Sequence, residues 1–145
     1  MIPVVQIRDA VVGDIDDMIF LLKELFSKEA DFCFNEALQR RGLSMMLEPC
    51  HSRRVLVACA GNRTIGMASI QTLISTTEGG LSGIVEDVVV APEWRVKGIG
   101  RRLLEAIGSW AHAKGLKRIQ LLADAANTPA LDFYKNSGWM TTRLI

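Results

Sequence analysis

The sequence has few of the residues that mark a disulfide-rich, metal-binding or membrane-spanning protein. Its three cysteines (Cys33, Cys50 and Cys59) are an odd number without Cys-x-x-Cys spacing, a pattern typical of reduced thiols. The two histidines, His51 and His112, are far apart and match no metal-ligand spacing. No apolar run approaches the roughly 20 residues that a membrane-spanning helix needs. These absences lead us to expect a cytoplasmic protein that holds no metal and spans no membrane.

An excess of charge of one sign is also absent. Lysine and arginine number 17, aspartate and glutamate 16, and the formal net charge is +1. Nucleic acids and membrane surfaces attract a basic excess, so neither is an expected partner. Residues 1–5 lack the charged and then apolar layout of a signal peptide. Four cations do gather at Arg95, Lys97, Arg101 and Arg102, where a small anionic ligand is a better explanation than a polymer.

No linker, repeat or low-complexity tract divides the chain, so we expect a single domain over residues 1–145. Asp14 is placed to cap a first helix over 15–26, and Asn127 or Thr128 to cap a last one that has Pro129 in its first turn and ends at Gly138. Periodicity and turn residues predict further helices over 35–47 and 98–114, and strands over 4–8, 54–60, 64–73, 84–90, 118–123 and 139–145. The order β-α-α-β-β-β-α-β-α-β describes an α/β fold, a mixed sheet with helices on both faces.

The most informative stretch runs from an apolar strand into a helix through Arg95-Val96-Lys97-Gly98-Ile99-Gly100. A glycine-containing turn at a helix N-terminus favours an anion, because unpaired N–H groups and the helix dipole both point at it. The Walker string Gly-x-x-x-x-Gly-Lys-Ser/Thr does not occur. A dinucleotide fingerprint would need a glycine or alanine where Leu103 stands. The pattern that remains is Arg-x-x-Gly-x-Gly.

A second string lies downstream, Asn127-Thr128-Pro129-Ala130-Leu131-Asp132-Phe133-Tyr134-Lys135-Asn136-Ser137-Gly138-Trp139. With the strand at 84–90, Pro92 and the Arg95–Gly100 loop, it resembles the GNAT superfamily of acetyl-CoA-dependent N-acetyltransferases. The likeness is specific over residues 84–139 and architectural before them. It implies the GNAT fold, acetyl-CoA as the acyl donor and an amine as the acceptor.

The resemblance also implies which residues bind the donor. Loop amides would hold the pyrophosphate of CoA, and the backbone of the strand at 88–90 would pair with pantetheine amides. The implied donor contacts are Val88, Val89, Val90, Arg95, Val96, Lys97, Gly98, Ile99, Gly100, Arg101, Asn127, Ala130, Tyr134 and Lys135. Val96 departs from the family, which usually has glycine there; if that position needs a positive φ, a β-branched residue is strained.

Two adjacent carboxylates precede the loop. Neighbours on a strand point to opposite faces, so Glu86 and Asp87 are expected on different sides of the sheet. Burial would raise the pKa of Glu86 toward that of a general base, which would take a proton from the substrate ammonium. Asp87 would bind a cationic substrate or a structural arginine. A structural ion pair remains the alternative for both carboxylates.

By resemblance, Tyr134 donates a proton to the departing CoA thiolate; the alternative is a buried ring with a satisfied hydroxyl. The predicted activity is direct transfer of an acetyl group to a primary amine in a ternary complex. A small amine, an amino acid and a peptide or protein amine all stay open as acceptor. A catalytically silent CoA-binding sensor and a protein-interaction module are the rival functions. A short last strand, or one supplied by the second copy in a homodimer, is also open.

Overall fold

Five strands form one sheet whose spatial order follows the sequence, β1-β2-β3-β4-β5. They are β1 (Val5–Asp9), β2 (Arg53–Ala60), β3 (Arg63–Ser75), β4 (Gly80–Val90) and β5 (Ile119–Leu121). Neighbours from β1 to β4 are antiparallel, whereas β5 runs parallel to β4 because a helix crosses between them. The computed structural model describes residues 3–29 and 31–143.

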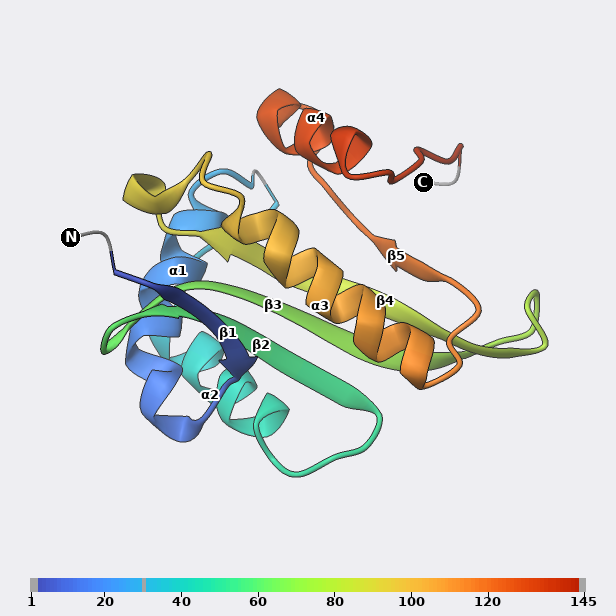
Figure 1. Cartoon of the computed structure of the whole chain (residues 1–145), viewed down its shortest axis with the longest axis horizontal. Coiled ribbons are helices and arrows are strands. Elements are labelled where there is room, and N and C mark those ends of the chain that lie inside the picture. The colour runs from blue at the N-terminus through green and yellow to red at the C-terminus, as the bar shows by residue number, and fades with distance from the viewer. Residues whose placement is uncertain (1–2, 30, 144–145) are drawn as a thin grey trace.

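Helices cover both faces of this sheet, as expected (Figure 1). Helices α1 (Ile15–Phe26) and α2 (Glu36–Met46) lie on one face, and α3 (Ile99–Ala113) lies on the other. Helix α4 (Thr128–Asn136) follows β5, and two short 3-10 turns, η1 (Val12–Asp14) and η2 (Pro92–Trp94), precede α1 and α3. The α/β class predicted from the sequence is confirmed.

The core lies between the sheet and its helices. Met18 of α1 and Leu103 and Ile107 of α3 are fully buried, and they recur at the helical spacing that predicted these helices. Val57 and Met67 supply the matching buried positions on the sheet. Within the ranges 3–29 and 31–143, no helix combines the length and apolar character that crossing a lipid bilayer requires.

Asp14 stands at the N-cap position of α1, but its side chain does not cap the helix. The buried carboxylate accepts hydrogen bonds from both Arg8 amino groups (2.7 and 2.8 Å), the Val11 amide (2.8 Å) and the Thr64 hydroxyl (2.9 Å). Arg8 is the main reason that the pKa of Asp14 is lowered. The expected cap is therefore a bridge that joins β1, η1 and β3.

We predicted a strand over 139–145, and this prediction is wrong for residues 139–143, which form no strand. Residues 144 and 145 lie outside the described ranges. A strand needs a hydrogen-bonding neighbour, and β5 offers only three residues. The chain instead leaves α4 through Gly138 (φ +93°), and the Trp139 ring packs against Tyr134 with centroids 6.1 Å apart. Packing on α4 thus takes the place of pairing in the sheet.

Candidate active site

Strands β4 and β5 separate partway along their length. β5 pairs only with Gly83–Val85, and the chain after it rises away from β4 to reach α4 (Figure 1). Over residues 86–90 of the described structure, β4 therefore has a strand neighbour on the β3 side alone. Backbone groups on the other edge are open to a ligand that carries amides.

A bulge interrupts β4 at the two carboxylates. Ser69 of β3 pairs with Glu86 and Met67 pairs with Val89, so two β4 residues, Asp87 and Val88, stand where β3 has one. Asp87 has a φ of +54°, which is uncommon outside glycine. The bulge breaks the strict alternation on which we placed Glu86 and Asp87 on opposite faces.

The loop from β4 to α3 ends at an open helix terminus. Gly98 occupies the N-cap position with a φ of +80°, and no side chain caps α3. The first amides of a helix have no intrahelical acceptor, so those from Ile99 to Arg101 are available to an anion. Val96 has a φ of +60° and a fully exposed side chain, so the positive φ that would strain a valine at this position is present.

The cations of this loop are not equally free. The Arg95 guanidinium donates to the Val90 carbonyl (3.0 Å) and to Glu24 of α1 (3.3 Å), and Arg102 donates to the Val5 carbonyl (3.0 Å). Lys97 lies over the Trp94 ring, 5.9 Å from its centroid, and Arg101 has only an exposed contact with Glu105 at 3.6 Å. Lys97 and Arg101 are therefore the side chains best able to turn to a phosphate.

Three carboxylates from two parts of the chain gather beside the β4 bulge: Glu86 and Asp87, and Glu29 from the loop after α1. Burial raises the pKa of Asp87 from 3.8 to about 6, and the charges of Glu86 and Glu29 act in the same direction. Burial and the charges of Asp124 and Glu86 likewise raise the pKa of Glu29. Sequence reasoning missed Glu29, because a loop glutamate carries no local signal of a partner on β4.

The burial expected for Glu86 is wrong, since this residue is exposed and Asp87 is the half-buried member of the pair. Glu86 keeps its regular register opposite Ser69, next to the buried Val85, whereas Asp87 lies in the bulge with a positive φ and leaves the alternation of the strand. Across residues 3–29 and 31–143, neither carboxylate forms an ion pair with a lysine or arginine. The alternative of a structural salt bridge thus finds no cation here.

Tyr134 of α4 faces the same region. Its half-buried ring packs against Phe133, with centroids 5.3 Å apart, and against Trp139. Burial, followed by the charge of Glu29, raises the pKa of the Tyr134 phenol to about 12. The hydroxyl therefore keeps its proton at neutral pH, as a proton donor must.

Helix α4 reaches the loop through close packing on α3. A Cβ added to Gly100 would lie 3.1 Å from Cζ of Phe133, so this glycine permits the approach. Asn127 caps α4 by accepting a hydrogen bond from the Ala130 amide (3.3 Å), as the sequence predicted. Ala130 is half-buried and Lys135 is exposed.

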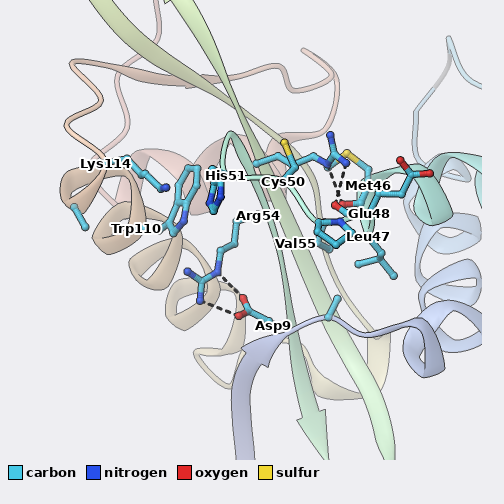
Figure 2. Close-up of a pocket in the computed structure, with 14 residues that line it drawn as sticks. Asp9, Met46, Leu47, Glu48, Cys50, His51, Arg54, Val55, Trp110 and Lys114 are labelled. Carbon is cyan, nitrogen blue, oxygen red and sulfur yellow. Dashed lines mark hydrogen bonds and ion pairs between the residues drawn. The ribbon is translucent and has the colours of Figure 1, made fainter.

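A pocket lies elsewhere on the molecule (Figure 2). It has a volume of about 610 Å³ and is lined by residues that include Asp9, His51, Arg54 and Trp110, and by none of the predicted donor or acceptor residues. Arg54 is held there by Asp9, and the Cys50 thiol lies 3.0 Å from the Ser52 hydroxyl. In the described part of the chain, no three His, Cys, Asp or Glu side chains are placed to hold a metal ion.

Several known proteins are similar to this chain in sequence, and the similarity includes the residues of the candidate site. A family model described as the acetyltransferase (GNAT) family matches residues 19–139. Aminoalkylphosphonate N-acetyltransferase of Salmonella typhimurium is 26% identical over 140 residues, which cover 96% of this chain and 87% of that protein. Thialysine N-epsilon-acetyltransferase of Bos taurus is 30% identical over 142 residues, with 92% and 83% covered.

Solved structures share the fold at lower identity. A transcriptional regulator from Bacillus halodurans superimposes with a TM-score of 0.86 at 24% identity, covering 98% of this chain and 97% of that one. Glucosamine-6-phosphate N-acetyltransferase from Arabidopsis thaliana gives 0.77 at 18%, covering 98% and 95%. These two likenesses concern the fold alone. Taken with the family model and the relatives, they lead to one conclusion: the chain belongs to the acetyltransferase (GNAT) family and is an N-acetyltransferase of that type.

Proposed function

We propose that the protein transfers the acetyl group of acetyl-CoA directly to a primary amine within a ternary complex. The observation that carries this proposal is one juxtaposition. An uncapped helix terminus and an open β4 edge lie next to a carboxylate cluster and a protonated tyrosine. The first two suit an anionic donor that contains amides, and the last two suit proton transfer to and from an amine and a thiol.

The residues present fit the donor. The amides of loop residues 96–101 would hold the pyrophosphate, with Gly98 and Gly100 allowing close approach, and the backbone at 88–90 would pair with the pantetheine amides. Asn127, Ala130 and Lys135 of the α4 segment would border the CoA moiety. When bound, acetyl-CoA supplies the activated thioester that the amine attacks. Orientation of the two reactants against this scaffold is the main contribution of the protein.

The carboxylate cluster would serve the acceptor. Its negative charges attract a cationic amine, and a base must then remove a proton before the nitrogen can attack. Asp87, with a pKa raised to about 6, is better placed for that step than the exposed Glu86. We therefore assign proton removal to Asp87, with Glu86 and Glu29 holding the ammonium group. The two relatives are named for aminoalkylphosphonate and thialysine.

Tyr134 would return a proton to the leaving sulfur. Its phenol is protonated at neutral pH and stands on α4, the helix that packs on the N-terminus of α3. A thiolate that leaves unprotonated is a poorer leaving group, so loss of this hydroxyl slows the chemical step.

The test is the rate of thiol release from acetyl-CoA with a panel of amines. The panel contains a diamine, a lysine-like amino acid and an aminoalkylphosphonate. Because the acceptor region carries several carboxylates, we expect the diamine to be used best and the phosphonate worst. Tight acetyl-CoA binding without turnover of any amine would instead support the CoA sensor, and absence of binding the interaction module.

Matched isosteric variants separate the roles. We expect Tyr134→Phe and Asp87→Asn each to lower kcat by about 100-fold, the lower range for loss of a general acid or base. Glu86→Gln should chiefly raise the KM for the amine. The reverse result, in which Glu86→Gln abolishes turnover and Asp87→Asn does not, would return the base role to Glu86.

A further inference from the structure

Arg95 is the first residue of the Arg-x-x-Gly-x-Gly loop, yet its side chain does not face an open anion site. Its Nε donates to the Val90 carbonyl at 3.0 Å, and its Nη2 donates to Oε1 of Glu24 at 3.3 Å. Both side chains are only about one-third exposed, 36% for Arg95 and 32% for Glu24. Arg95 thus connects the end of β4 to α1 across the start of the loop.

The other contacts at this start are local: the Arg95 amide donates to the Pro92 carbonyl (3.3 Å), and Lys97 lies over the Trp94 ring. Val96, Lys97 and Gly98 are all exposed, and two of the three have a positive φ. The next buried residue is Ile99, at the first position of α3. The loop amides therefore lie between two attachment points: Ile99 in the core on one side and Arg95 on the other.

Glu24 supplies the attachment from α1. This helix leads directly into the segment that carries Glu29, and in Figure 1 its C-terminal part and the β4–α3 connection lie at the same end of the molecule. One ion pair therefore joins the helix that precedes Glu29, one of the three acceptor carboxylates, to the loop that would hold the donor. A partly buried, charged hydrogen bond is stronger than an exposed ion pair, so it can hold the loop in place.

We propose that Glu24 is a positioning residue for donor binding: acting through Arg95, it holds loop residues 96–101 in the conformation that receives the CoA pyrophosphate. The inference rests on the proposed function only in naming CoA as the ligand. Arg95 is then an anchor of the loop and not itself a phosphate ligand.

The experiment is a double-mutant cycle on acetyl-CoA affinity, measured by calorimetry on the full chain. Glu24→Ala and Arg95→Ala should each raise Kd by about fivefold, as loss of roughly 1 kcal/mol predicts. The double variant should be no weaker than either single one, because both changes break the same bridge. The KM for acetyl-CoA should rise in step, with kcat at saturation nearly unchanged.

A matched control lies on the same helix. Asp16 of α1 pairs with Arg40 of α2 at 2.8 Å, exposed and away from the loop, so Asp16→Ala should leave the donor affinity unchanged. Glu24→Gln keeps an acceptor for Arg95 and should fall between wild type and Glu24→Ala. Additive effects of the two alanine changes would overturn the proposal, because Arg95 would then bind the donor independently of Glu24. An unchanged Kd in Glu24→Ala would overturn it equally.

A readout without ligand separates this inference from the proposed function. Amide hydrogen exchange at residues 96–101 of the unliganded protein should be faster in Glu24→Ala than in wild type and Asp16→Ala. If wild type fails to bind acetyl-CoA but the exchange difference appears, the proposed donor is wrong and the positioning role stands. If exchange in the loop is unchanged, the positioning role is wrong whatever the ligand.

Discussion

Asp87 carries its charge where the fold disfavours it, and this makes stability depend on pH. Its pKa is raised from 3.8 to about 6, chiefly by burial, so the folded state binds the proton more tightly than the unfolded chain does. The stabilisation that this bound proton gives to the folded state is fully present below the pKa of Asp87 in the unfolded chain, and it is lost as pH rises through about 6. We expect Asp87→Asn to raise the free energy of unfolding by about 2 kcal/mol near pH 7.5, and by under about 0.5 kcal/mol near pH 4.

Urea unfolding at the two pH values measures the effect. The neighbouring Glu86→Gln is the control, because this carboxylate is exposed and removing its charge relieves Asp87 only indirectly. A gain for Asp87→Asn that is the same at both pH values would show that burial of the charge is not its cause.

Val96 offers a second test at the level of one backbone angle. A β-branched residue at φ +60° is strained, and this exposed side chain gains nothing from packing. We expect Val96→Gly to stabilise the protein by about 1 kcal/mol and Gly98→Ala, at φ +80°, to destabilise it by about 1 kcal/mol. Neither site has a neighbour that would confuse the comparison: Val96 is fully exposed, and a Cβ at Gly98 meets nothing within 4 Å. A loss of stability in Val96→Gly would contradict the strain.

These residues show what the sequence could reveal of the site. The strain at Val96 was predictable, because the family pattern places glycine where this chain has valine. The roles of Glu29 and Arg95 were not, since each depends on a partner that is distant in sequence: Glu86 and Asp87 for the first, Glu24 for the second. Periodicity also assumes a regular strand, so it could not foresee the bulge that half-buries Asp87.

At the level of elements, α3 and α4 pack closely at Gly100. A Cβ on Gly100 would lie 3.1 Å from the Phe133 ring, whereas one on Gly108, further along α3, would meet nothing within 4 Å. We expect Gly108→Ala to stabilise the protein by about 1 kcal/mol through helix propensity. Gly100→Ala should forfeit that gain, because Phe133 must move and α4 with it, and it should also weaken acetyl-CoA binding.

Urea unfolding and calorimetry with acetyl-CoA test the pair of variants. Equal stabilisation by both alanines, with unchanged donor affinity in both, would show that α4 adjusts freely and does not help to form the donor site.

The long helix α3 was predictable, whereas the last strand was not. The helix α3 repeats its buried residues over 15 positions, and its observed start and end lie within one residue of those expected. The strand expected over 139–145 rested on composition alone, without a signal for a neighbour, and residues 139–143 do not form it. The Asp14 carboxylate was expected to cap α1, but in the fold it accepts hydrogen bonds from Arg8 and Thr64, which are not its neighbours in the sequence.

For the whole molecule, ligand binding should appear as added thermal stability. A ligand at 100 times its Kd that binds only the folded state contributes about 2.7 kcal/mol, which is a rise of several degrees for a domain of this size. We expect acetyl-CoA, and CoA to a smaller extent, to raise Tm in a concentration-dependent way, as differential scanning fluorimetry can measure. An unchanged Tm at millimolar acetyl-CoA would favour the protein-interaction module over the enzyme.

The parting of β4 from β5 also bears on how the protein behaves when it is concentrated. An open strand edge is a template for pairing with another chain, and the exposed Leu122 adds an apolar contact just beyond β5. A donor that pairs with β4 at residues 88–90 would cover this edge. The unliganded form is thus the one prone to self-association, and adding acetyl-CoA or CoA during purification should keep the chain dispersed.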